Sequence, residues 1–279
     1  MTDQTADLPA AAESTRLSRG RPTFIHSVTF RRGTVLVALA LLWQIAADLA
    51  GNPLMLPSFT RTATALWDAL LHENLATAVL ASLSVLIKGY LIALALAIVL
   101  VSLAVANVFI REALLTLSAM FNPLPAIALL PLAMLWFGLG EMSLIFVLVH
   151  SVLWPFALAT FTGFQSVPET HRLVGRNYGL TGPRYVAHIL IPSALPSIIS
   201  GLKIGWAFAW RTLIAAELVF GVSSSQGGLG WFIFRNRNEL FTDKVFAGLV
   251  SVILIGLLVE FGVFRALESV TIRRWGTQT

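Results

Sequence analysis

Several ionisable side chains lie inside long apolar stretches of the sequence, and they are the first candidates for chemistry. The set is Lys88, His150, Lys203, Arg211 and Glu217. A charge at membrane depth costs a few kcal/mol, so each of these residues needs a functional role or a partner. Lys203 is expected to snorkel to the membrane surface, and Lys88 either to pair or to snorkel. His150 is interpreted as a hydrogen-bonded packing residue, with a proton relay as the alternative.

Familiar catalytic and cofactor-binding patterns are absent from the sequence. It contains no G-x-x-x-x-G-K-[ST] phosphate loop, no H-E-x-x-H pair and no G-x-S-x-G elbow. The five histidines are scattered and there is no cysteine, so we expect neither a metal site nor a disulfide. The chain is therefore expected to hold no cofactor and to catalyse no covalent step.

The composition is that of an integral membrane protein. Hydrophobic residues make up 57% of the 279 residues and charged residues 12%, about half the ~25% of soluble domains. The mean hydropathy is +0.81. A water-soluble globule would expose large apolar patches at this composition. The net charge of +5 is explained by basic loops on the cytoplasmic side of a membrane, so no nucleic-acid partner is expected.

Six apolar stretches are long enough to cross a membrane, and all are expected to be helical because lipid offers the backbone no hydrogen-bond partners. They are residues 34–50, 75–106, 113–137, 142–164, 189–220 and 245–267. Pro123, Pro125 and Pro131 interrupt the third stretch. We expect its broken backbone to line a cavity near Asn122, with an ordinary kink as the alternative.

The distribution of basic residues predicts the orientation of the chain. With the N-terminus inside, twelve of the 19 Lys and Arg residues fall in inner segments, four in outer segments and three within spans. This asymmetry obeys the positive-inside rule and places both termini in the cytoplasm. Residues 1–33 form a cytoplasmic tail without the features of a signal peptide, and residues 34–279 form the membrane domain.

The inner loop, residues 165–188, has the pattern of two short helices. Pro168 suits the first turn of a helix that reaches Tyr178, and Gly179 can end that helix in the left-handed conformation. Thr181 can cap a second helix. This polar hairpin is interpreted as a contact for a soluble motor, with an amphipathic loop on the membrane surface as the alternative.

The residues after this loop carry a resemblance to a known family. In GLTGPRYVAHILIPSALPSIISGLKIG, Pro192 follows Gly179 by thirteen residues. This order resembles the cytoplasmic EAA loop of permease subunits in bacterial ATP-binding-cassette (ABC) importers. Two further stretches, NPLPAIALLPLAMLWFGLGE and WRTLIAAELVFG with GGLGWFIF, are similar to the nitrate/sulfonate/taurine branch. The resemblance covers residues from about 55 to 265 and implies the type I importer permease fold, with six transmembrane helices, a core at about 70–265 and a coupling helix.

The resemblance also implies which residues couple the chain to an ATPase. They are Glu169, Arg172, Arg176, Gly179 and Arg184. The sequence departs from the family where Glu-Ala-Ala is usual, because alignment on Gly179 places Leu173, Val174 and Gly175 there. Glu169 lies four residues too early to be the usual carboxylate. An ion pair between Arg172 or Arg176 and an acidic rim on the ATPase could replace the contact that the usual carboxylate makes.

The segment 189–220 is implied to line the translocation pathway. The pathway residues are Asn122, Trp210, Arg211 and Glu217. At 100° per residue, Arg211 points about 100° away from Trp210. Glu217 is interpreted as a gate or a helix-packing residue. Arg211 is interpreted as attracting an anion, and a structural ion pair with Glu217 or Glu260 is the alternative.

The function implied by the resemblance is import of a small anionic solute such as nitrate, a sulfonate or taurine. Two copies of the chain would form the pathway in a bacterial inner membrane. Two ATPase subunits would carry ATP and Mg²⁺, and a periplasmic binding protein would deliver the solute. An ion-coupled secondary transporter is the alternative, but it predicts paired mid-membrane carboxylates and an inverted repeat. An intramembrane enzyme would need a constellation around His150 that the sequence lacks.

Overall fold

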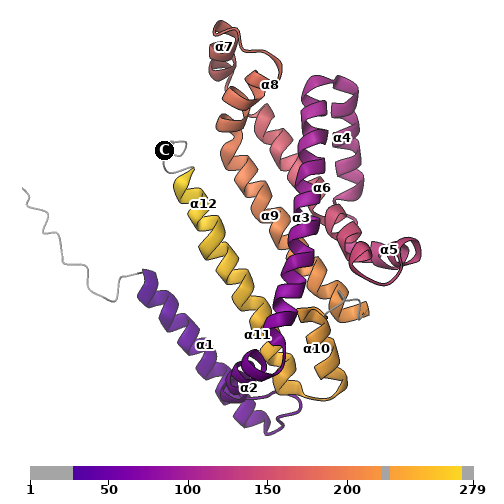
Figure 1. Cartoon of the computed structure of the whole chain (residues 1–279). Coiled ribbons are helices and arrows are strands. Elements are labelled where there is room, and N and C mark those ends of the chain that lie inside the picture. The colour runs from indigo at the N-terminus through magenta and orange to yellow at the C-terminus, as the bar shows by residue number, and fades with distance from the viewer. Residues whose placement is uncertain (1–27, 221–226, 272–279) are drawn as a thin grey trace, which may run out of the picture.

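The computed structural model describes residues 28–220 and 227–271, and helices are their only regular secondary structure (Figure 1). Most of the predicted tail, residues 1–27, lies outside the described residues, as do 221–226 and 272–279. In chain order, the elements are α1 (Val28–Ala50), α2 (Phe59–His72), α3 (Leu75–Ala106), α4 (Val108–Phe121), η2 (Ala126–Leu129), α5 (Leu130–Phe137), α6 (Glu141–Gln165), α7 (Glu169–Asn177), α8 (Gly182–Tyr185), η3 (Val186–Leu190), α9 (Ile191–Phe220), α10 (Leu229–Asn238), α11 (Thr242–Leu258), η4 (Val259–Phe264) and α12 (Arg265–Val270).

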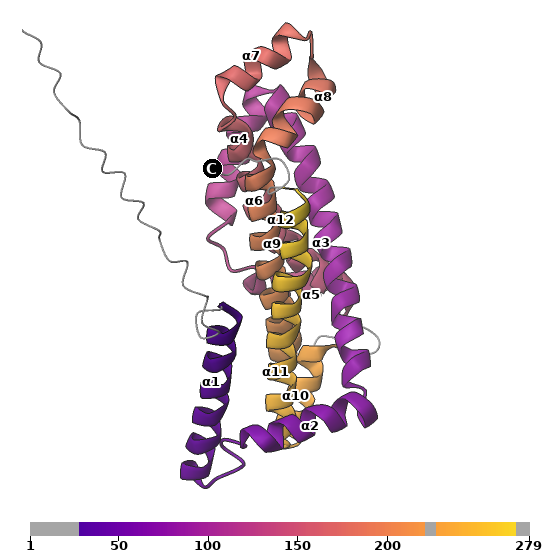
Figure 2. The same cartoon turned by 90° about the vertical axis from the view of Figure 1, so that its left-hand side faces the viewer.

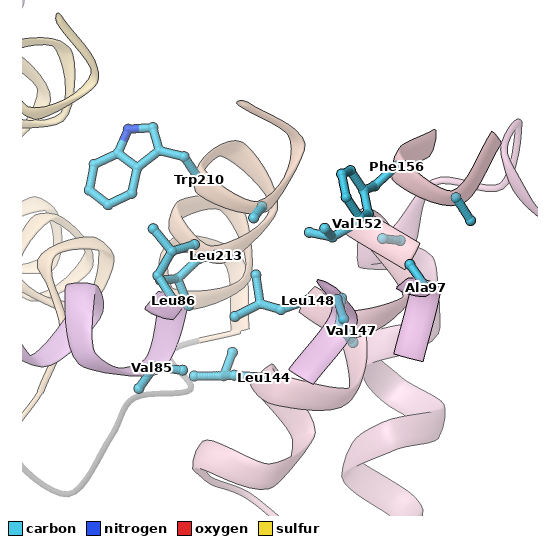
Figure 3. Packing of buried hydrophobic residues seen from close by; sticks show 14 of the residues in the cluster. Val85, Leu86, Ala97, Leu144, Val147, Leu148, Val152, Phe156, Trp210 and Leu213 are labelled. Carbon is cyan, nitrogen blue, oxygen red and sulfur yellow. The ribbon is translucent and has the colours of Figure 1, made fainter. Parts of the chain in front are cut away.

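Three long helices, α3, α6 and α9, form the centre of the molecule. Helix α6 lies between the other two and packs extensively against both. Figure 3 shows Leu86 of α3, Leu148 of α6 and Leu213 of α9 meeting in the core, and all three side chains are fully buried. The remaining helices are arranged around this trio, with α4 and α5 packed against α6 and with α10 and α11 packed against each other.

Glycines allow the three central helices to approach closely. A Cβ atom added at Gly89 of α3 would lie 2.8 Å from Leu148 Cβ of α6. A Cβ atom at Gly163 of α6 would lie 2.6 Å from Ser197 Cβ of α9. Small residues at such contacts are typical of membrane helices, whose association depends on van der Waals packing because lipid supplies no hydrophobic driving force between them.

The prediction of six apolar spans is confirmed with one refinement. Among the described residues, five helical segments are long and apolar enough to cross a membrane, and a bent helix pair makes a sixth. Four of the unbroken segments lie close to the predicted ranges. The predicted first span also extends further toward the N-terminus, because α1 begins at Val28 and includes Arg31 and Arg32.

The predicted break in the third span is confirmed at Pro123 and Pro125 but not at Pro131. Helix α4 ends at Phe121, and the following η2–α5 segment is bent from it by 90°. Pro123 and Pro125 lie at the bend, where each lacks the N–H that would extend the helical hydrogen bonds. Pro131 does not break a helix, because it lies in the first turn of α5, where no such bond is needed.

The short helices are divided between the two ends of the bundle. Helices α7 and α8 project together at one end, whereas α2 and α10 lie at the other (Figures 1 and 2). Helix α2 begins directly after Ser58, whose Oγ accepts a hydrogen bond from Arg61 N at 3.3 Å. The chain thus has one end with a projecting hairpin and one end covered by a transverse helix.

The glycine contact between α6 and α9 gives a stability prediction. We expect Gly163→Ala to lower the thermal unfolding midpoint of the detergent-solubilised protein, because the added methyl group overpacks the contact at a cost of about 1–3 kcal/mol. Gly33→Ala is the control, since no atom lies within 4 Å of its added Cβ. Equal midpoints for Gly163→Ala and the wild type would contradict the proposed close packing.

Candidate functional site

The bend between α4 and η2 borders a cavity of about 290 Å³. Asn122, Pro123 and Pro125 line it from the bend, and Arg211 lines it from α9. The structure therefore brings together two of the four predicted pathway residues, Asn122 and Arg211. Both side chains are exposed in the single chain. The prediction that the broken span borders a cavity near Asn122 is confirmed.

The guanidinium of Arg211 is only partly engaged. Its Nε donates a hydrogen bond to the carbonyl of Ala207 at 2.9 Å, and its Cζ lies 5.1 Å from the ring centroid of Phe208. No acid in the described part of the chain forms an ion pair with it. The alternative predicted for Arg211, a structural ion pair with Glu217 or Glu260, is thus not formed in this structure. The remaining N–H groups of its guanidinium are available to a partner in the cavity.

Aromatic side chains form another wall of the cavity. Trp154 Nε1 donates a hydrogen bond to His150 Nδ1 at 3.3 Å. Phe121 stacks on Trp154 at 5.1 Å between ring centroids and meets His150 edge-on. His150 is therefore fixed by its neighbours, as expected for a packing histidine, and it is also part of the cavity wall.

Glu217 lies outside the cavity, in a fully buried junction between α3, α9 and α10. Ser82 Oγ of α3 donates to its carboxylate at 2.8–2.9 Å, and Gly230 N of α10 donates to Oε2 at 2.8 Å. Ser82 Oγ in turn accepts from Leu229 N at 2.8 Å. A Cβ atom at Gly228 would collide with the carboxylate, so glycine is required there. The carboxylate holds the first turn of α10 against α3 and α9.

Trp210 is buried on the side of α9 that faces α11. Its Nε1 donates to the carbonyl of Val252 at 3.3 Å, and the side chain is 6% exposed. It does not line the cavity. The structure thus separates Trp210 and Glu217, which pack against other helices, from Arg211, which faces the cavity.

The two lysines within the spans, Lys88 and Lys203, are paired with acids. Lys88 Nζ lies 2.6 Å from Glu141 Oε1 at the start of α6. Lys203 Nζ lies 2.5 Å from Glu268 and 3.4 Å from Glu260. Both lysines therefore have acidic partners, which accounts for their presence in apolar helices.

The hairpin of α7 and α8 has the predicted form. Helix α7 ends near Gly179, which has φ +67°, and Leu180 N donates to Gly175 O at 3.0 Å. Thr181 occupies the predicted cap position before α8 in extended backbone, although its side chain makes no capping bond. A Cβ atom at Gly175 would lie 2.9 Å from Tyr185 and Ile189, so this glycine lets α7 pack against the second helix.

The arginines of the hairpin point to different partners. Arg172 donates to the carbonyls of Phe164 at 2.7 Å and Val167 at 3.1 Å, and thereby binds α7 to the end of α6. Arg176 and Arg184 are exposed. Arg176 Nη1 lies 3.8 Å from a carboxylate oxygen of the exposed Glu169. Arg172 is thus largely occupied within the chain, whereas Arg176 and Arg184 face outward.

Sequence reasoning missed several residues at these sites. Ser82 completes the junction around Glu217, and Ser151 and Thr212 add hydroxyl groups to the cavity lining. A single hydroxyl in an apolar helix has no distinguishing pattern, because it can equally bond to its own helix. The only sequence signal for the Glu217 junction was the glycine-rich stretch GGLG that follows Glu217 in the chain. Glycines often mark positions where the backbone approaches another group closely.

Comparison with known proteins places the chain among transport proteins. The family model "Binding-protein-dependent transport system inner membrane component" matches residues 89–268. The taurine transport system permease protein TauC of Escherichia coli is 30% identical, over 87% of this chain and 88% of the relative. The nitrate import permease protein NrtB of Synechocystis is 30% identical, over 93% and 94%. The bicarbonate transport system permease protein CmpB of Synechococcus elongatus is 27% identical, over 89% and 94%.

The junction around Glu217 predicts how firmly α10 is held. We expect Glu217→Ala to increase hydrogen exchange of the amides of Leu229 and Gly230 on the order of ten- to hundredfold, because loss of the buried acceptor costs about 1–3 kcal/mol. Hydrogen exchange with mass spectrometry of the 228–238 segment measures this. Glu112→Ala, at an exposed acid of α4, is the control. Unchanged exchange in Glu217→Ala would show that the carboxylate does not hold α10.

Proposed function

The chain belongs to the family of binding-protein-dependent transport system inner membrane components, which are permease subunits of ABC transporters, and on this premise we propose that it imports a small anion. Two copies of the chain form the pathway, and a periplasmic binding protein delivers the solute. ATP and Mg²⁺ bind to two separate ATPase subunits. The chain lies in a bacterial inner membrane with both termini in the cytoplasm, in agreement with its excess of basic residues in inner segments.

The observation that carries this proposal is the exposed, unpaired guanidinium of Arg211 on a spanning helix. A charge at this depth does not face lipid, because its transfer into hydrocarbon is unfavourable. An aqueous pathway between two copies gives it a suitable environment, and its sign favours an anion. Three relatives are named for taurine, nitrate and bicarbonate, which are all small molecules that carry an anionic group. Asn122 contributes a polar group to the same route.

Trp210 and Glu217 serve this route indirectly. Trp210 fixes the rotation of α9 by packing against α11. Glu217 ties the same helix to α10 and α3. Together, these contacts hold Arg211 toward the cavity. Glu217 is thus a packing residue at the end of the bundle where α10 lies.

The hairpin of α7 and α8 is the surface that receives the ATPase. Leu173 and Val174 are 48% and 47% exposed, and Tyr178 is 80% exposed. Leu173 occupies the position where related permeases usually have the glutamate of Glu-Ala-Ala. The contact that replaces this carboxylate is therefore apolar, and Arg176, Arg184 and Glu169 surround it with charge. Gly179 and Arg172 fix the shape of this surface from within the hairpin.

Co-purification tests the proposed coupling surface. We expect Leu173→Asp to remove most of an ATPase that otherwise co-purifies with the detergent-solubilised chain from its native host, because a charge in an apolar contact is desolvated without a partner. Quantitative mass spectrometry of the purified complex measures the ratio of the two proteins. Met55→Asp, at an exposed position between α1 and α2, is the matched control. A chain that purifies alone and transports without ATP would instead support the ion-coupled transporter.

The conformation of Gly179 gives a second test of the same surface. We expect Gly179→Val to reduce ATP-driven uptake in proteoliposomes, because a β-branched residue is strained at φ +67° and the hairpin must change shape. Gly179→Asn is the matched variant, since Asn tolerates this conformation and the added side chain has open space. Equal uptake by both variants would mean that the hairpin's turn has no part in coupling.

A further inference from the structure

The cavity beside Arg211 has a polar side and an apolar side. Arg211, Asn122 and Thr212 supply donors on the polar side. The rings of Phe121 and Trp154, together with Pro155, supply the apolar side. Binding pockets for small molecules commonly combine an apolar lining with a few convergent polar groups. From this arrangement we infer that the cavity is a binding site within the permease for a small organic anion, an inference that rests on the proposed function.

The head group of such an anion has a ready counter-charge. Only Nε of Arg211 is committed to a protein acceptor in the described chain, and its guanidinium is held over Phe208. The two terminal nitrogens can therefore donate together to two oxygens of one sulfonate or carboxylate group, which is the geometry that makes such pairs strong. The contacts with Ala207 and Phe208 orient the guanidinium before the anion arrives, which reduces the entropy lost on binding.

The rings on the apolar side of the cavity are in contact with one another. The hydrogen bond between Trp154 and His150 fixes both rings, and Phe121 is stacked against the indole. These rings come from α4 and α6, while Arg211 comes from α9. A ligand in the cavity therefore contacts three helices at once, with its charged end at α9 and its apolar end against the aromatic rings.

The lining of the cavity favours an organic anion over a bare inorganic one. The cavity has a volume of about 290 Å³, and aromatic rings form one of its walls. A nitrate ion would fill a small part of this space and leave the aromatic wall in contact with water. A short alkylsulfonate would place its sulfonate at Arg211 and bury its alkyl group against Phe121 and Trp154. The permease would then contribute to selection of the solute together with the binding protein.

Calorimetric titration of the purified permease–ATPase complex in detergent tests the site directly. We expect saturable binding of ethanesulfonate, weaker binding of nitrate, and no binding of the neutral ethyl methyl sulfone. Arg211→Gln should weaken ethanesulfonate binding on the order of ten- to hundredfold, as expected for loss of a charge-assisted contact. Arg235→Gln, at an exposed cation on α10, is the matched control and should leave binding unchanged.

A second variant separates the apolar contact from the charge. Phe121→Leu should weaken ethanesulfonate binding and leave nitrate binding unchanged, because only the organic anion reaches the ring. Equal affinity for the sulfone and the sulfonate would overturn the inference, as would nitrate binding at least as tightly as ethanesulfonate or unchanged binding in Arg211→Gln.

The same preparation distinguishes this inference from the proposed function. A complex that contains the ATPase but binds no ethanesulfonate overturns the internal site and leaves the importer intact. A chain that binds ethanesulfonate but never associates with an ATPase supports the site and overturns the importer.

Discussion

The close packing of α6 against both α3 and α9 is the contact on which the rest of the structure depends. Apolar side chains gain little by leaving lipid for one another, so the helices are held by shape complementarity at short distance. Gly89 of α3 permits the close approach to α6, and Gly163 of α6 permits the close approach to α9. The cavity is lined by residues of α6 and α9, and the hairpin is attached to the same two helices. The Glu217 junction joins α3 to α9, which α6 holds on either side.

The charges inside the spans show how the fold separates structural from accessible groups. Lys88 and Lys203 have acidic partners, and the Glu217 carboxylate accepts hydrogen bonds from a serine and from the first turn of a helix. Arg211 rests on an aromatic ring and a carbonyl, with no acid beside it in the described residues. Among charged groups in apolar helices, the one without an acidic partner is the one that remains available to bind a solute, and here that group is Arg211.

The sequence was sufficient to predict the spans and the hairpin, because long apolar runs and local capping residues carry strong signals. The run 75–106 matches α3, and Gly179 adopts the predicted left-handed conformation. The 90° bend after Phe121 was beyond such reasoning, since proline indicates that a helix breaks but not the direction the chain then takes. The inward direction of Arg172 and the part played by Ser82 depend on neighbours distant in sequence. The roles of Asn122, Trp210, Arg211 and Glu217 in transport stay predictions.

The attachment of the hairpin has a mechanical consequence. Arg172 fastens α7 to the last carbonyls of α6, and η3 runs directly into α9. Gly175 allows α7 to contact residues of η3 and α8, so the hairpin is one compact unit that is attached to α6 and to α9. A force applied to the hairpin is therefore transmitted to α6 and α9 together.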